Sequence, residues 1–248
     1  MLSGRVFITG GAGFLARAIY KQAAEEGWPC EFTAFSRDDS KHVALHQRFP
    51  HVRTIRGDVA GTDVEILAGY MRGHDYVIHA AANKYVDLAE QNPWETMRVN
   101  VHGSENVALA AIRAGVKRVV GISTDKAASP VSTYGLSKAA MERLFLRAFP
   151  FSGRTEFVVV RYGNVVGSTG SFIAKLWDER MSSKPVKVTN PEMTRFWMRP
   201  RDAVKIVVAG LTYEGAYNSI LVPSLPSLAN FQVVEAICPN RAIETVGS

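Results

Sequence analysis

The chain has 248 residues, enough for one large α/β domain or for one domain with a small additional lobe. Its 2 cysteines, Cys30 and Cys238, form neither a zinc ligand set nor a disulfide framework. The formal net charge is +6, but the basic residues are spread along the chain and form no long block. Composition therefore argues against a metal site and against nucleic-acid binding, and it favours a phosphorylated small molecule as the ligand.

No apolar run approaches the length of a membrane span. Met1 leads almost directly into an apolar strand, without the charged start and apolar stretch of a signal peptide. Together with the low cysteine content, these features predict a cytoplasmic protein without a membrane segment.

The first element is a short apolar strand, 5–10, which runs into a glycine turn and then a helix. Gly10 permits the turn, and Gly13 lets the backbone approach a pyrophosphate. Phe14 and Leu15 open the helix, whose N-terminus presents free N–H groups and a positive dipole end. This order predicts a dinucleotide-binding loop, and a tight turn without a ligand is the alternative.

The second strand, 30–35, ends where a dinucleotide fold recognises the adenosine ribose. Ser36 stands where an acidic residue would bind the 2′-hydroxyl of NAD, and Arg37 and Lys41 suit the 2′-phosphate of NADP. The sequence therefore favours NADP, while the two aspartates after Arg37 keep NAD open.

The next elements read as a strand over 52–59, a strand over 74–82 and a long helix over 93–115. His79 is read as a core residue, and Asn100 as a hydrogen-bond partner of the neighbouring strand. Strands that alternate with helices predict a doubly wound parallel sheet, with ligands at the carboxyl ends of its strands. At those ends we expect further cofactor contacts from Asp58, Val59, Ala80, Ala81, Ala82 and Asn100.

The candidate catalytic residues lie in the stretch 123–138. Tyr134 and Lys138 are four positions apart at the start of a predicted helix, so both side chains lie on one face. A cation about 4 Å away stabilises a tyrosinate by roughly 4 kcal/mol, which is enough to bring a phenol into use as a base. Thr124, Asp125 and Lys126 follow the apolar strand before the helix and suggest more chemistry than a hydride transfer. A chance helical pair beside a solvated loop is the alternative.

A further strand, 156–165, is predicted to leave Asn164 at the ligand edge, before a polar turn and a helix to about residue 181. Arg195, Arg199 and Arg201 then lie among aromatic residues, either as a diphosphate clamp or as an interface surface. Helices are expected over 202–211 and 229–237, with a strand over 218–222. We expect a cofactor domain over 1–166, to which part of 199–222 returns, and a substrate lobe over 167–248.

These residues resemble the extended short-chain dehydrogenase/reductases, and more narrowly the inverting UDP-N-acetylglucosamine 4,6-dehydratase group of polysaccharide-biosynthesis enzymes. The most specific matches are Ser-Thr-Asp-Lys-Ala at 123–127, Arg-Tyr-Gly-Asn-Val at 161–165 and Met-Thr-Arg-Phe-Trp at 193–197. The glycine loop and the Tyr134/Lys138 spacing are shared more widely.

The resemblance implies a nucleotide-sugar 4,6-dehydratase with tightly bound, regenerated NADP. Tyr134, helped by Lys138, would take the 4-hydroxyl proton, with Thr124 near O4. Lys126 would then remove the C5 proton, and Asp125 would assist departure of the C6 hydroxyl. The resemblance also implies cofactor contacts from Tyr162 and Val165, and substrate contacts from Lys84, Asn164, Ser171 and Arg195.

The stretch up to Ser248 contains no Arg-Pro-Gly-Glu-Lys-like segment, so we expect a reduced substrate lobe. The substrate could then be smaller, differently held or completed by a neighbouring subunit. The family implies a homo-oligomer in which helices 93–115 and 133–149 pair between subunits. The alternatives are a C4 epimerase or reductase of the same superfamily and a non-catalytic NADP-binding protein.

Overall fold

The computed structural model describes residues 1–246, without the side chains of residues 148–152. The chain forms two compact units, one of Met1–Arg161 with Val204–Val222 and the other of Tyr162–Ala203 with the C-terminal segment from Pro223. Residues 247–248, which belong to the predicted reduced lobe, lie outside the described residues. Whether these units correspond to cofactor and substrate domains stays a prediction.

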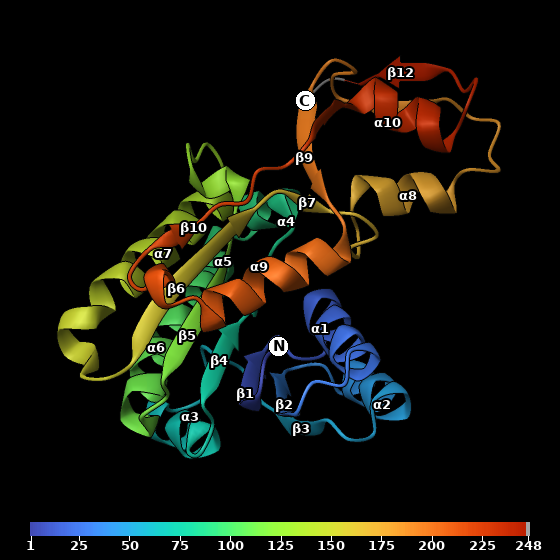
Figure 1. The fold of residues 1–248 in the computed structure, drawn as a ribbon. Helices are drawn as coiled ribbons and strands as arrows, with labels where there is room; N and C mark the ends of the chain where they lie inside the picture. Colours follow the sequence, from blue (N-terminus) through green and yellow to red (C-terminus); the bar gives the residue numbers. More distant parts are fainter. Residues whose placement is uncertain (247–248) are drawn as a thin grey trace. The chain divides into compact units, whose positions relative to one another are not determined.

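The first unit is built on a seven-stranded sheet with the order β3-β2-β1-β4-β5-β6-β10 (Figure 1). β1 pairs in parallel with both β2 and β4, and the pairs β2–β3, β4–β5 and β6–β10 are also parallel. The chain order reverses between β1 and β4, which makes this point the crevice where such sheets bind ligands. The strands are β1 (Gly4–Thr9), β2 (Cys30–Ser36), β3 (Arg53–Arg56), β4 (Tyr76–His79), β5 (Arg118–Thr124), β6 (Glu156–Tyr162) and β10 (Ile220–Leu221).

Helices cover both faces of this sheet, because neighbouring residues of a strand point to opposite faces. On β5, Val120 contacts Gly210 of α9, whereas the next residue, Gly121, lies against Phe145 of α7. Figure 1 accordingly shows α1 and α9 on one face and α3, α6 and α7 on the other. The helices are α1 (Phe14–Glu25), α2 (Asp39–Arg48), α3 (Val64–Met71), α4 (Val86–Gln91), α5 (Pro93–Met97), α6 (Gly103–Ala114), α7 (Thr133–Ser152) and α9 (Pro200–Thr212).

This architecture confirms the predicted doubly wound parallel fold and changes some of its elements. The single helix expected over 93–115 consists of α5, a π-helical segment Arg98–His102, and α6, which ends at Gly115 in the left-handed conformation. The strand expected over 156–165 is interrupted at Gly163, with β6 before it and the short β7 (Asn164–Val165) after it. Helices α2 and α3 were not predicted.

The second unit has a three-stranded sheet of order β11-β9-β7 and a pair of strands, β12 and β8. Its strands are β8 (Val186–Val188), β9 (Thr194–Met198), β11 (Ser227–Ala229) and β12 (Ile243–Thr245), and its helices are α8 (Phe172–Asp178) and α10 (Asn230–Ile237). Trp197 packs with apolar residues of α8, β8 and α10 in a core of its own. The segment 193–201 is thus partly a strand with a buried face.

Within the described part of the chain, no helix combines the length and apolar character that crossing a membrane requires.

Substitution of Gly10 tests how closely the backbone is packed at the crevice between β1 and β4. It has φ +67°, and an added Cβ would lie 2.8 Å from the backbone of Ala80 and Ala81. Gly27 has a similar φ of +62° but open space around it. We expect Gly10→Ala to lower the free energy of unfolding by about 2–4 kcal/mol, from backbone strain plus the clash, and Gly27→Ala by about 1 kcal/mol. Urea unfolding of both variants measures the difference, and equal losses would show that the close approach is unimportant.

Candidate active site

The glycine turn after β1 has the form that a pyrophosphate requires. Gly10 makes the turn, and Gly13 is the N-cap of α1. Within the described chain, no side chain caps this helix N-terminus, and its first turn has no acidic residue. The N–H groups that begin at Phe14 and Leu15 and the positive end of the helix dipole therefore suit an anion.

The small residues after β4 lie directly against this turn. Thr9 joins the two strands, because its hydroxyl contacts His79 Nδ1 at 2.8 Å and accepts from Ala81 N–H at 3.3 Å. His79 is fully buried, and its Nε2 lies 2.9 Å from the Ser104 hydroxyl. Burial lowers the pKa of His79 to about 3, which supports its reading as a neutral core residue. Ala80, Ala81 and Ala82 are partly exposed, so their backbone can contact a ligand.

Asn100 positions the site and has no exposed surface of its own. Its Oδ1 accepts from Asn83 N–H at 2.7 Å, and its Nδ2 donates to Asn83 O at 3.0 Å and to Ser137 Oγ at 2.9 Å. The π-helical segment turns this side chain inward, between the loop after β4 and α7. Its predicted bond to the neighbouring strand region is therefore present, and its cofactor contact stays a prediction.

The residues predicted to recognise the adenosine end form ion pairs. Arg37 lies 3.5 Å from Glu95, and Lys41 lies 2.9 Å from Asp38. Asp58 accepts from Arg98 at 2.9 Å and from Ala60 N–H at 3.1 Å. The beginning of α2 and the Glu95–Arg98 turn thus form one charged cluster around the end of β2.

The catalytic candidates are brought together by β5 and the first turn of α7. Thr124 ends β5 and is followed by a 3₁₀ turn, Asp125–Ala127. The N-cap Ser132 accepts from Gly135 N–H at 3.1 Å, which fixes the start of α7. A Cβ on Gly135 would lie only 2.5 Å from Lys126 O. Glycine at this position therefore lets the helix carrying Tyr134 approach the Asp125–Lys126 turn.

Four predicted residues form one interacting group. The Thr124 hydroxyl interacts with Tyr134, which lowers the pKa of Tyr134 in part, and it donates to Asp125 Oδ1 at 2.9 Å. Lys126 Nζ donates to the same carboxylate oxygen at 3.1 Å. The hydroxyl also accepts from Lys126 N–H at 3.4 Å.

Burial shifts the pKa values of Tyr134 and Lys138 in opposite directions. It raises the pKa of Tyr134 to about 12, although the bond to Thr124 lowers it in part. It lowers the pKa of Lys138 to about 7, and the negative charge of Glu142 opposes that shift. Lys138 is 2% exposed, and its Nζ contacts Met141 Sδ at 2.9 Å. The expected lowering of the Tyr134 pKa by Lys138 is not seen, because desolvation penalises both charged forms.

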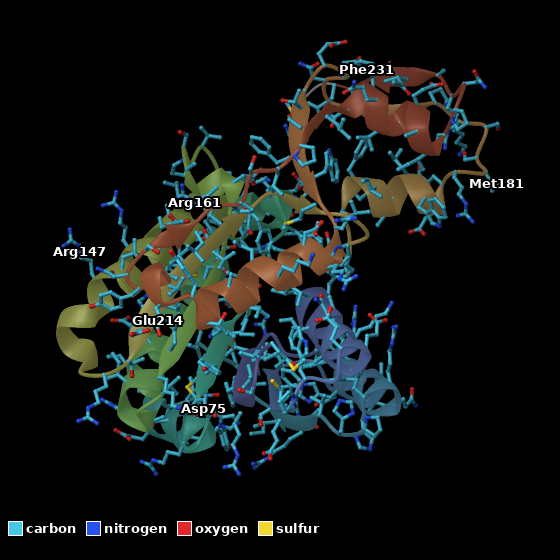
Figure 2. All side chains as sticks on the ribbon, in the orientation of Figure 1. Asp75, Arg147, Arg161, Met181, Glu214 and Phe231 are labelled. Atoms are coloured by element: carbon cyan, nitrogen blue, oxygen red, sulfur yellow. The ribbon has the colours of Figure 1, made fainter. Side chains whose placement is uncertain are left out.

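A buried ion pair that the sequence analysis missed lies one turn further along α7. Arg161, labelled in Figure 2, donates to Glu142 through Nε at 3.0 Å and Nη2 at 2.6 Å. Ser123 Oγ donates to the same carboxylate at 2.5 Å. These bonds hold α7 against β5 and β6. The sequence signal for Glu142 was its spacing of four residues from Lys138, which places both side chains on one face of the helix.

The remaining predicted contacts are spread over both units. Lys84 is exposed in the first unit, with Nζ 5.4 Å from the centre of the Tyr85 ring. In the second unit, Asn164 opens β7 opposite Trp197 of β9, and the Ser171 hydroxyl caps α8. The Arg195 guanidinium bonds within its own segment, to Thr194 O at 2.9 Å and to Met193 Sδ. Tyr162 and Val165 also belong to the second unit, and their cofactor contacts stay predictions.

Comparison with known proteins identifies the family. A family of polysaccharide biosynthesis proteins matches residues 6–244. The chain belongs to this family. It is 39% identical to a UDP-N-acetylglucosamine 4,6-dehydratase (inverting) of Campylobacter jejuni, over 98% of the chain and 73% of that protein. It is 37% identical to a UDP-glucose 4-epimerase of Rickettsia rickettsii, over 90% of the chain and 66% of that protein.

The fold has solved counterparts. One is the dTDP-glucose 4,6-dehydratase DesIV of Streptomyces venezuelae, determined with NAD bound, which has a TM-score of 0.85 at 21% identity. The match covers 98% of this chain and 84% of that one. The resemblance to extended short-chain dehydrogenase/reductases, and to the inverting dehydratase group, is thereby confirmed.

The buried Lys138 should make stability depend on pH. Its pKa is about 7 in the folded chain and about 10.5 when unfolded, so between these values the unfolded chain binds the extra proton. Stability therefore rises with pH across this window, by at most about 1.4 kcal/mol per pH unit. We expect Lys138→Met to be more stable than the wild type near pH 7, with an advantage that shrinks towards pH 9.

Urea unfolding at several pH values measures this difference. Lys117→Met is the control, because Lys117 is exposed and its bond to Asp75 raises its pKa. Its ammonium stays protonated in both states, so the difference from the wild type should be flat. A flat difference for Lys138→Met as well would contradict the burial argument.

Proposed function

We propose that this protein is an NADP-dependent nucleotide-sugar 4,6-dehydratase acting on a substrate like UDP-N-acetylglucosamine. The observation that supports it best is that Tyr134 and Thr124 lie beside the Asp125–Lys126 pair. A simple oxidation at C4 needs one base. Elimination of water needs a second base and an acid, and we assign these roles to Lys126 and Asp125.

The residues of the first unit suit a nicotinamide dinucleotide. The N-terminus of α1 offers N–H groups to the pyrophosphate, and Gly10 and Gly13 leave room for it. Lys138 is a buried amine whose hydrogen-bonding partner is a thioether, a weak acceptor, so ribose hydroxyls would satisfy it better. When bound, the cofactor supplies the acceptor and donor of a hydride.

In the first half of the reaction, Tyr134 takes the proton of the sugar 4-hydroxyl while C4 is oxidised. Burial opposes this step, because it raises the pKa of Tyr134 to about 12. The Thr124 hydroxyl stabilises the tyrosinate by turning its proton from Asp125 towards it. Lys138 stabilises it further when protonated, as does the positive charge of an oxidised nicotinamide.

In the second half, the 4-ketone acidifies the proton on C5. Moving one proton within the Lys126–Asp125 pair, whose atoms lie 3.1 Å apart, yields a neutral amine and a neutral carboxyl group. The proposed step uses this neutral form, in which the amine has a free lone pair. The Lys126 amine can then accept the C5 proton, and Asp125 can donate its proton to the C6 hydroxyl, which leaves as water. The products balance as one 4-keto-5,6-unsaturated sugar and one water, and hydride return to C6 with protonation at C5 completes the cycle.

A C4 epimerase or reductase is the second candidate, favoured by the similarity to the UDP-glucose 4-epimerase. Such an enzyme would use only Tyr134 and Lys138 and leave the Asp125–Lys126 pair without a role. A non-catalytic NADP-binding protein would need neither the Tyr134/Lys138 nor the Asp125/Lys126 set. The substrate contacts assigned to Lys84, Asn164, Ser171 and Arg195 and a homo-oligomeric state remain part of the proposal.

Substitution of Lys126 tests the assignment. Incubation with UDP-N-acetylglucosamine should give a product one water lighter, as measured by mass spectrometry. Lys126→Met should slow water loss by about 100-fold or more, because it removes the base, and should leave NADP affinity within about twofold. Lys117→Met, at an exposed lysine, should behave like the wild type.

Each other outcome identifies an alternative. Water loss that survives Lys126→Met would refute this base. A wild-type product of unchanged mass would indicate the epimerase, and net consumption of NADPH would indicate a reductase. The absence of activity on a panel of UDP-, GDP- and dTDP-sugars would favour the binding protein.

A further inference from the structure

The feature that the site description leaves unexplained is a histidine at the end of β2. Ser36 is the last residue of this strand, and His42 lies in the second turn of α2, which begins after the N-cap Asp38. His42 Nε2 lies 2.5 Å from Ser36 Oγ, and both residues are partly exposed. Ser36 occupies the position from which this fold reads the 2′ substituent of the adenosine ribose.

The charged side chains around Ser36 cancel one another. Arg56 is the residue paired with Ser36 across β2 and β3, and it bonds to Asp39 at 3.2 Å. Every other cation of the group also has a carboxylate partner within 3.5 Å. The group consists of the cations Arg37, Lys41, Arg56 and Arg98 and the carboxylates Asp38, Asp39, Asp58 and Glu95.

Two of these carboxylates are held in the charged form. The bonds from Lys41 keep the pKa of Asp38 below its ordinary value, and Arg98 does the same for Glu95. The group therefore holds as many negative as positive charges. Among the described residues, His42 forms no ion pair with these carboxylates, and its ring contacts Ser36 instead.

The Ser36–His42 bond also decides what Ser36 offers to a ligand. A serine hydroxyl has one proton and two lone pairs. If Ser36 donates to His42, its oxygen faces the ligand as an acceptor, which suits a ribose 2′-hydroxyl. If His42 donates to Ser36, the Ser36 proton is directed to the ligand, which suits the acceptor oxygens of a 2′-phosphate.

We propose that His42 is the specificity determinant for the 2′ position of the cofactor, selecting NADP by donating to Ser36 so that the Ser36 proton is directed to the 2′-phosphate. This inference rests on the proposed cofactor site and is independent of the dehydration chemistry. It shifts the expected selection from the Arg37/Lys41 pair, whose charges are engaged by Glu95 and Asp38, to a residue that the sequence analysis passed over.

The test is direct binding of NADP⁺ and NAD⁺ to the full chain by titration calorimetry at fixed ionic strength. His42→Glu adds a negative charge and can only accept from Ser36, so we expect it to weaken NADP⁺ about 30-fold or more and NAD⁺ less than about threefold. His46→Glu is the matched control, because it makes the same exchange one turn further along α2 at an exposed position. It should change either affinity by less than about threefold.

His42→Gln and His42→Leu test the hydrogen bond. The Gln amide can still donate to Ser36, whereas Leu cannot. We expect His42→Gln to keep the NADP⁺ affinity within about threefold of the wild type and His42→Leu to lose about tenfold or more. A purely structural role of His42 would not produce this difference.

Equal losses in His42→Glu and His46→Glu, or equal NADP⁺ affinities of His42→Gln and His42→Leu, would overturn the proposal. Circular dichroism of each variant confirms that it is folded. If the wild type binds neither nucleotide, the proposed function fails as a whole. If it binds NADP⁺ without dehydrating any sugar nucleotide, the dehydratase assignment fails and the proposal for His42 stands or falls on the affinities alone.

Discussion

The candidate site depends on the fact that Thr124 has only one hydroxyl proton. That proton is given to Asp125, while the oxygen accepts from Lys126 N–H and interacts with Tyr134. The hydroxyl can stabilise a tyrosinate only by turning away from Asp125, which then keeps Lys126 as its donor. Deprotonation of Tyr134 and release of Asp125 are therefore linked. This link would connect oxidation at C4 with elimination at C5 and C6, because the acid of the second step becomes available when the first base has been used.

Burial of Tyr134 and Lys138 accompanies their close packing, and it also opposes the charged forms that the proposed reaction uses. The same desolvation raises the pKa of Tyr134 to about 12 and lowers that of Lys138 to about 7. Both side chains are thus driven towards their neutral forms in the absence of further charge. Glu142 acts against this shift at Lys138, and its own charge is stabilised by Arg161 and Ser123. A buried ion pair of this kind contributes little net stability. Its role is to hold α7 against β5 and β6 and to favour the protonated form of Lys138 through the charge of Glu142.

Sequence patterns predicted the sheet, the glycine turn and the residues around Tyr134, because each depends on local spacing that chemistry restricts. They did not predict the π-helical segment, in which Asn100 is buried. Nor did they reveal that the charges of Arg37 and Lys41 are engaged, because Glu95 is distant in sequence from Arg37 and the N-cap role of Asp38 belongs to a helix that was not expected. Burial could not be predicted from the sequence either. A spacing of four residues places Tyr134 and Lys138 together but does not show how much contact with water each side chain loses on folding.

The net charge of +6 suggested an anionic ligand, and the structure shows why net charge is a poor guide to where such a ligand binds. The cations near Ser36, the ammonium of Lys126 and the guanidinium of Arg161 all face carboxylates. Within the described chain, Lys138 has no carboxylate within ion-pair distance, and α1 begins without a side-chain cap. The backbone N–H groups of α1 and the buried amine of Lys138 are therefore donors that no carboxylate engages, and both are fixed in place before a ligand arrives. Preorganised donors of this type lose little entropy on binding, which suits a cofactor that remains bound through the catalytic cycle.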